Sequence, residues 1–201
     1  GFSIAIGNAA GQTNQNEYSI AIGANAGNDT QFGSAIAIGL DAGHTSQQIG
    51  TIALGYKSGN SIQGEYAIAL GAEAGYGTQG GNAIALGKYA GKYIQGGYAI
   101  AIGAGAGSGS IDSDGNMGGG QGGSSIALGY NCGNLNQGYD SVAIGREAGK
   151  NNQSSDAISI GKLSGNNSQA SGSIAIGRNS GSTDQSNNSI AIGNEAGKTN
   201  Q

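Results

Sequence analysis

Few residues in this chain belong to the types that carry out catalysis. The 201 residues include one His (His44), one Cys (Cys132), 12 acidic and 8 basic residues. Nucleophilic catalysis needs a base beside a nucleophile, and hydrolysis of sugar bonds needs a pair of carboxylates. Neither arrangement occurs at a fixed spacing here. Cys132 stands where similar segments of the chain carry Ala or Ser, so we expect a buried thiol. We therefore expect no enzymatic activity and no cofactor.

One segment has the spacing of a cation-binding loop. Asp112, Asp114 and Asn116 place oxygen-bearing side chains at alternate positions, as Ca²⁺ loops do. The segment lacks the distant bidentate Glu that completes an EF-hand loop. A polar bulge without a metal is the alternative interpretation, and it is the one we favour. As an exposed loop in a regular array, the segment is also a candidate contact site.

Aromatic residues are concentrated in one stretch of the chain. Six of the nine Tyr fall in this stretch: Tyr56, Tyr66, Tyr76, Tyr89, Tyr93 and Tyr98. Exposed rings stack on sugars or anchor protein partners. The alternative is ordinary variation at exposed turns. We treat the six as a candidate contact patch.

A column of Gln is the most regular polar feature. Gln recurs at a constant interval, broken once: Gln15, Gln31, Gln47, Gln63, Gln79, Gln95, Gln121, Gln137, Gln153, Gln169, Gln185 and Gln201. Identical amides one strand spacing apart can hydrogen bond to one another in a ladder. The alternative is that each Gln caps a carbonyl of its own turn. Either role is structural.

The Gln column belongs to a repeat of the whole chain. The segment Ile-Ala-Ile-Gly, or a close variant, begins at Ile4, Ile20, Ile36, Ile52, Ile68, Ile84, Ile100, Ile126, Val142, Ile158, Ile174 and Ile190. The interval is 16 residues except after Ile100, where it is 26. Such a period indicates identical units that stack into a rod. We predict one repeat domain over residues 1–201, with a ten-residue loop insertion within residues 108–123.

The pattern within each repeat predicts strands and turns. Counted from its Ile or Val, a repeat has aliphatic residues at positions 1 and 3, Ala or Ser at position 2, and Gly at positions 4 and 8. Alternation indicates a strand, and two Gly per repeat would cost a helix roughly 2 kcal/mol. We predict an all-β parallel β-roll, or β-solenoid, of about twelve coils. We expect the aliphatic pair to point into the core, and the small residues at positions 2 and 16 to face outward against other copies.

The repeats carry a family resemblance. Residues 19–26 and 141–148 resemble the head repeats of trimeric autotransporter adhesins of the YadA type. The continuation Ala90-Gly91-Lys92-Tyr93-Ile94-Gln95 is similar to arrays in phage tail-fibre and large-virus proteins. The resemblance implies a left-handed roll, a homotrimer and display on a cell surface or virion. The strict 16-residue period and the invariant Gln depart from the adhesin pattern.

Composition narrows the function further. The net charge of −4 leaves no basic stripe for nucleic acid, and no apolar run is long enough for membrane insertion. The leading hypothesis is an extracellular structural or adhesive fibre segment that assembles with itself and contacts a host glycan or protein. Because both ends fall within a repeat without a cap, we expect a piece of a longer chain or a subunit that abuts another copy. An end-to-end filament is the alternative. An ice-binding solenoid is less favoured because no regular Thr column exists, and a polysaccharide hydrolase is disfavoured because acidic pairs are missing.

Overall fold

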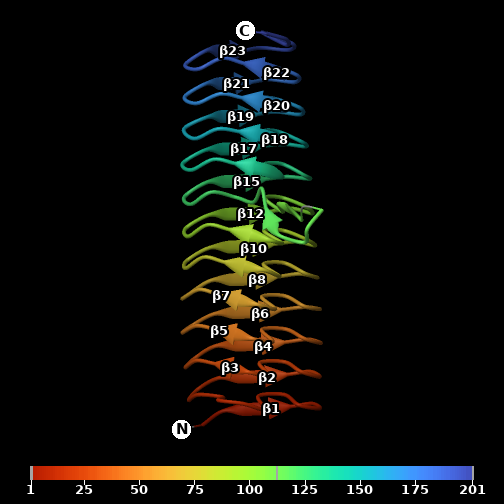
Figure 1. Ribbon diagram of the computed structural model, residues 1–201, viewed down its shortest axis with the longest axis vertical. Helices are drawn as coiled ribbons and strands as arrows, with labels where there is room; N and C mark the ends of the chain where they lie inside the picture. The colour runs from red at the N-terminus through yellow and green to blue at the C-terminus, as the bar shows by residue number, and fades with distance from the viewer. Residues whose placement is uncertain (1, 112, 201) are drawn as a thin grey trace.

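The described part of the chain is a stack of β-coils. The computed structural model describes residues 2–111 and 113–200, and the strands within these ranges form a rod with the two chain ends at opposite tips (Figure 1). About twelve coils, 16 residues apart, make up this β-solenoid, which confirms the predicted fold class. Within the described ranges, no helix is long and apolar enough to cross a membrane.

One parallel sheet of twelve strands, here called sheet A, runs the full length of the rod. Its strands occupy positions 1 to 3 of each repeat, and neighbours pair in strict register, as Ile20 pairs with Ile36. The strands are β1 (Ile4–Ile6), β2 (Ile20–Ile22), β4 (Ile36–Ile38), β6 (Ile52–Leu54), β8 (Ile68–Leu70), β10 (Ile84–Leu86), β12 (Ile100–Ile102), β15 (Ile126–Leu128), β17 (Val142–Ile144), β19 (Ile158–Ile160), β21 (Ile174–Ile176) and β23 (Ile190–Ile192).

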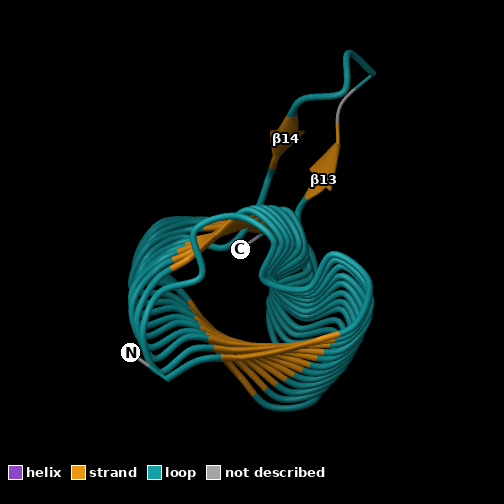
Figure 2. Cartoon of the chain, turned by 90° about the horizontal axis from the view of Figure 1, so that it is seen from below, coloured by secondary structure: helices purple, strands orange, loops and turns teal. Residues whose placement is uncertain are grey.

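A second set of short parallel strands, here called sheet B, lies across the coil from sheet A (Figure 2). Its first five strands are β3 (Thr30–Gln31), β5 (Ser46–Gln47), β7 (Ile62–Gln63), β9 (Thr78–Gln79) and β11 (Ile94–Gln95). Its last four are β16 (Leu135–Gln137), β18 (Asn151–Gln153), β20 (Asn167–Gln169) and β22 (Thr183–Gln185). Between the two groups, Gln121 forms only isolated bridges to Gln95 and Gln137.

The corner after each strand of sheet A requires glycine. Gly23, at position 4, has a φ of +126°, a conformation that L side chains rarely adopt. A Cβ atom on Gly23 would lie 2.6 Å from the carbonyl oxygen of Gly39 in the next coil. The absence of side chains at position 4 therefore lets the backbones of successive coils come into contact.

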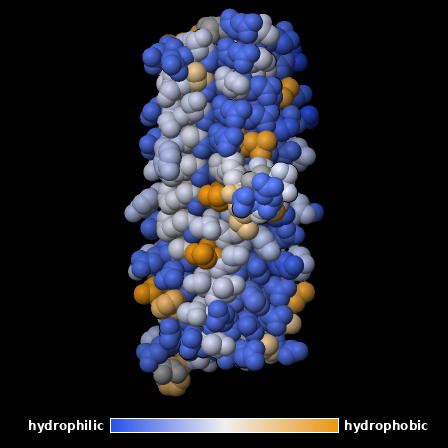
Figure 3. Space-filling view, viewed as in Figure 1, coloured by the Kyte–Doolittle hydropathy of each residue, from blue (hydrophilic) through white to orange (hydrophobic). Residues whose placement is uncertain are grey.

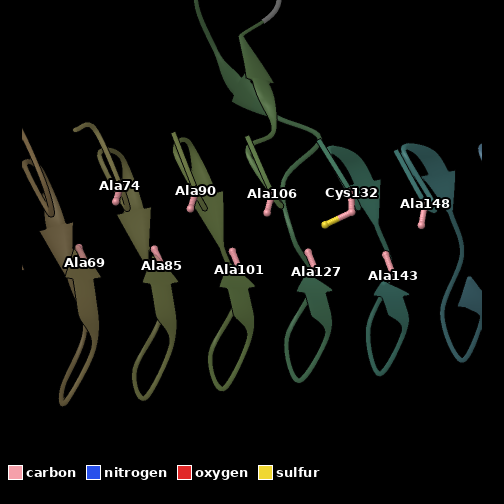
Figure 4. Packing of buried hydrophobic residues seen from close by; sticks show 10 residues of the cluster. All are labelled: Ala69, Ala74, Ala85, Ala90, Ala101, Ala106, Ala127, Cys132, Ala143 and Ala148. Atoms are coloured by element: carbon pink, nitrogen blue, oxygen red, sulfur yellow. The ribbon is translucent and has the colours of Figure 1, made fainter. Parts of the chain in front are cut away.

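The core consists of Ala rather than Ile. The Ala side chains of positions 2 and 7, such as Ala85 and Ala90, are fully buried and point toward each other across the coil (Figure 4). Ile and Leu at positions 1 and 3 point outward, and Leu86 keeps 38% of its surface exposed. The predicted inward orientation of the aliphatic pair was therefore wrong. The coil is narrow, and one Gln with small side chains already fills it.

The inward orientation of the small residues also affects two predictions, the packing of copies and the binding of ice, which both needed these residues on the surface. Positions 2 and 16 are buried within the chain, for example Ala37 and Ala35, so in the described coils these positions form no outward-facing strip of small residues. The expected packing of copies through that strip was wrong for this reason. The ice-binding alternative rested on the same strip and has no support from the structure.

The ten-residue insertion forms a hairpin. Strands β13 (Ser110–Ile111) and β14 (Met117–Gly118) pair antiparallel, and the hairpin projects from the rod on the side away from sheet A (Figure 2). Among the three residues of the candidate Ca²⁺ loop, Asp112 lies outside the described residues. Asp114 and Asn116 are exposed near the tip of the hairpin.

Candidate functional site

The outward side chains of sheet A form what we call the aliphatic stripe: positions 1 and 3 of all twelve repeats. Because successive residues of a strand point to opposite faces, the buried Ala at position 2 forces its two neighbours outward. In the middle of the rod Leu54 exposes 39% of its surface and Leu128 40%, so neighbouring coils cover these side chains only in part. No charged residue interrupts the stripe.

The size of the stripe distinguishes it from the scattered apolar residues of an ordinary surface. Strands stacked ~4.8 Å apart give twelve coils a length of roughly 55 Å. Apolar surfaces that are contiguous over such a distance mark interaction sites in soluble proteins. The face seen in Figure 3, from which the hairpin projects, is different: it is mainly hydrophilic or neutral, with isolated apolar side chains.

The Gln column lies inside the coil and joins the two sheets. In each of the eleven coils whose Gln is described, Gln Nε2 donates to the backbone oxygen at position 1 of the same coil, over 2.8 to 3.1 Å. Gln31, for example, reaches Ile20 across the interior and also donates to Ala35 O at 3.1 Å. The amide thus adds a second donor to backbone carbonyls such as Ala35 O, which also accepts from Ile20 N at 2.9 Å.

Contacts between successive Gln are present but discontinuous. Five Nε2–Oε1 hydrogen bonds of 3.1 to 3.3 Å join Gln15 to Gln31, Gln47 to Gln63, Gln79 to Gln95, Gln95 to Gln121, and Gln153 to Gln169. Among the described residues, the buried Oε1 atoms of Gln47, Gln79, Gln137, Gln153 and Gln185 have no partner. Every described Gln of the column bonds to the backbone across the coil, and some also bond to each other or to the carbonyl four residues later.

The six predicted Tyr do not lie in one patch. Tyr66 and Tyr98 occupy position 15, on the turn that leads from sheet B to sheet A, and are well exposed. The other four, Tyr56, Tyr76, Tyr89 and Tyr93, lie between positions 5 and 10, on the opposite turn. The structure therefore divides the candidate contact patch into two separate groups.

Lysines accompany the rings of the second group. The Lys92 ammonium lies 4.6 Å from the centre of the Tyr89 ring, 4.8 Å from that of Tyr93 and 2.9 Å from a carboxylate oxygen of Glu73. Partial burial alone would lower the pKa of Lys92, but the hydrogen bonds to Glu73 and Tyr93 raise it overall. Lys92 is therefore cationic at neutral pH and holds the rings and the carboxylate together.

The groups that sequence reasoning considered for chemistry are dispersed. Cys132 is buried at position 7, and burial raises the pKa of its thiol to about 12. His44 lies on a turn, 3.4 Å from the Thr45 hydroxyl. Within the described ranges, no three His, Cys, Asp or Glu side chains lie close enough together to hold a metal ion.

Sequence reasoning missed a groove at the base of the hairpin. The groove has a volume of about 640 Å³, and its lining includes Ile94, Asn136, Tyr139 and Asn152. A change in position 11 of the repeat marks the place. In the five coils before the hairpin that contain sheet B strands, this position holds residues such as Ile62 and Thr78, whereas the first coil has Asn14 with a φ of +53°. After the hairpin come Asn136, Asn152, Ser168 and Asp184, all with φ between +51° and +55°.

Comparison with known proteins supports the adhesin resemblance over part of the chain. The family described as YadA head domain repeat matches residues 169–196, in two copies. This match confirms the resemblance to YadA-like head repeats in the last coils of the rod. Comparisons with curated proteins and with solved structures gave no significant match.

Proposed function

We propose that the chain is a segment of a surface-displayed adhesive fibre in which parallel copies join through the aliphatic stripe. The adhesin-type repeat and the solenoid fold both belong to proteins of structural type. Three copies are the arrangement that the YadA resemblance implies. Display on a cell or virion surface and contact with a host glycan or protein complete the proposal.

The exposed stripe is the observation that carries this proposal. Its 24 aliphatic side chains are only partly covered within one chain. Covering the remainder would add roughly 0.5–1 kcal/mol per side chain, a fraction of the ~1.5–3 kcal/mol of full burial. The stripe is straight and regularly spaced, so a second copy with the same period can pack against it coil by coil.

The arrangement leaves the opposite side of each copy free. Sheet B and the hairpin lie away from sheet A (Figure 2), so contact through the stripe does not cover them. This outer surface is rich in Asn, Ser and Gln and carries the exposed ring of Tyr139. Such a surface suits contact with external partners.

Sedimentation equilibrium tests the proposal. We expect the wild-type chain to sediment as a trimer. The double variant Leu86→Glu and Leu128→Glu places charges at the centre of the stripe and should sediment as a monomer. Ile62→Glu is the matched control, because Ile62 exposes 50% of its surface on sheet B, away from the stripe. A wild-type monomer, or equal masses for all three proteins, would contradict the proposal.

A further inference from the structure

The groove at the base of the hairpin lies where sheet B is interrupted. The chain leaves the coil after Gly109 and returns through Gly119 and Gly120, so position 11 of this coil has no side chain. Ile94 borders the hollow in the preceding coil, and Asn136 and Asn152 border it in the two that follow. The groove therefore spans four coils on the face that the aliphatic stripe does not occupy.

Backbone contacts keep the groove from being filled by its own residues. A Cβ atom on Gly120 would collide with the backbone oxygen of Ile94, and one on Gly122 would lie 2.7 Å from the carbonyl carbon of Gly138. Larger residues at these positions would separate the coils. The groove is thus a consequence of how the hairpin joins the stack. It is formed in the free chain and needs no ligand to open it.

The amides at the edge of the groove are held in place by one another. Asn136 Nδ2 donates to Asn152 Oδ1 at 2.8 Å. Among the described residues, no other hydrogen bond of these two side chains is seen, so Asn136 Oδ1 and Asn152 Nδ2 remain available as one acceptor and one donor on successive coils. Both residues have a positive φ, which fixes their backbones in the left-handed conformation. Ser154 and Ser155 contribute further polar groups to the lining.

An aromatic ring stands beside these amides. Tyr139 lines the groove and exposes 65% of its surface. Its ring lies against the preceding coil, because a Cβ atom on Gly123 would be 3.4 Å from Tyr139 Cδ1. The ring is therefore supported from one side and accessible from the other. The lining contains no charged side chain.

We propose that this groove binds a short neutral oligosaccharide. The apolar face of a sugar ring would stack on Tyr139, while its hydroxyls bond to Asn136 Oδ1 and Asn152 Nδ2. The volume falls within the ~300–1,000 Å³ of small-ligand sites. This inference rests on the proposed adhesive function and adds the class of ligand. The groove is formed by a single chain and does not depend on assembly.

The charges favour a neutral glycan over an acidic one. The net charge is −4, and Asp140 and Asp156 lie next to groove residues along the chain, so carboxylated or sulfated sugars would be repelled. A protein partner is a weaker fit, because stable protein interfaces cover about 800 Å² per partner and need an apolar centre.

Binding of the intact chain to an immobilised panel of neutral oligosaccharides, with sialylated and sulfated counterparts, tests this inference. We expect binding to neutral glycans alone. Tyr139→Ala should weaken binding at least tenfold, whereas Tyr139→Phe keeps the ring and should bind within about threefold of wild type. Asn152→Asp keeps the acceptor for Asn136 but loses the Nδ2 donor, and it should also bind at least tenfold more weakly. The control Tyr130→Ala removes a ring that is 54% exposed outside the groove and should bind like wild type.

Three results would overturn the inference: no neutral glycan bound by wild type, equal binding by Tyr139→Ala and Tyr130→Ala, or a preference for acidic glycans. Sedimentation of the same samples separates this inference from the fibre proposal. A monomer that binds neutral glycans through Tyr139 would leave the groove in place and refute the assembly. A trimer that binds no neutral glycan would support the assembly and refute the groove as a glycan site.

Discussion

At the scale of single residues, the fold depends on how buried polar atoms are satisfied. Buried hydroxyls bond to a carbonyl three residues earlier, as Ser141 does to Gly138 O at 2.8 Å. Ser159, which replaces Ala at position 2, donates to Gln169 Oε1. The Gln amides give a second donor to carbonyls that already accept a backbone N–H, as Ala35 O does from Ile20 N. The core therefore accommodates a polar side chain where the repeat supplies a hydrogen-bond partner for it.

Gln79→Leu tests the contribution of one internal amide. The substitution keeps most of the volume but removes the donor for Ile68 O (2.8 Å) and Ala83 O (3.3 Å). We expect a loss of about 2–3 kcal/mol in the free energy of unfolding, because the hydrogen bonds of Gln79 Nε2 are lost and the buried Oε1 of Gln95, which accepts from it, is left without a partner. Chemical denaturation measures it. Gln12→Leu, at an exposed position, should change stability by less than about 0.5 kcal/mol, and equal effects of the two variants would contradict the structural role.

The Cys132 thiol gives stability a dependence on pH. Its pKa is about 12 in the folded chain against an ordinary value of 9.0, because burial disfavours the thiolate. The unfolded chain loses this proton first, so stability falls as pH rises above about 9. We expect wild type to lose about 1 kcal/mol more than Cys132→Ala between pH 8 and pH 10. Parallel denaturation curves for both proteins would disprove the effect.

At the scale of elements, the sequence predicts where strands lie better than which way they face. The period placed every strand of sheet A, and the alternation showed that positions 1 and 3 face opposite to position 2. Alternation does not say which side is inside, since both faces carry apolar residues. The sizes of the side chains carry that information. Position 2 holds only Ala or Ser, as a narrow interior requires, whereas position 3 accepts both Ile and Leu.

The position 4 corner gives a sharp test of element geometry. Gly23→Ala introduces a Cβ atom at a φ of +126° and 2.6 Å from Gly39 O, so we expect a loss of at least about 3 kcal/mol. Gly33→Ala in the same coil meets only Glu17 O at 3.5 Å and has no such φ; it should be neutral or slightly stabilising. Thermal melts compare the two. Similar melting temperatures would mean that the corner is not built as described.

The change at position 11 allows a second comparison. Ser168 lies after the hairpin with a φ of +54°, whereas Thr78 lies before it in strand β9. A β-branched residue is disfavoured at positive φ, so Ser168→Val should lose about 1–2 kcal/mol. Thr78→Val should cost less than about 0.5 kcal/mol. If both variants unfold at the same denaturant concentration, the two halves of sheet B do not differ in backbone conformation.

At the scale of the whole molecule, the rod has two faces with different roles. One carries the aliphatic stripe and the other the hairpin with its groove, so assembly and ligand contact need not compete. The stack was predictable because the same contacts recur in every coil. The groove was not, because Ile94, Gly120, Asn136 and Asn152 become neighbours only once the insertion leaves the stack. The sequence marked the insertion as a candidate contact site, and the change in residue type at position 11 is a second trace of the groove.

Disulfide cross-linking from the stripe tests the central claim most directly. Leu86→Cys places a thiol on the stripe, and Ile62→Cys places one on sheet B. In dilute, oxidised samples we expect Leu86→Cys to yield covalent dimers on a non-reducing gel, because equivalent residues of parallel copies meet at the contact. Ile62→Cys should remain a single chain. Cross-linking of Ile62→Cys with none for Leu86→Cys would show that the copies meet elsewhere and would contradict the account.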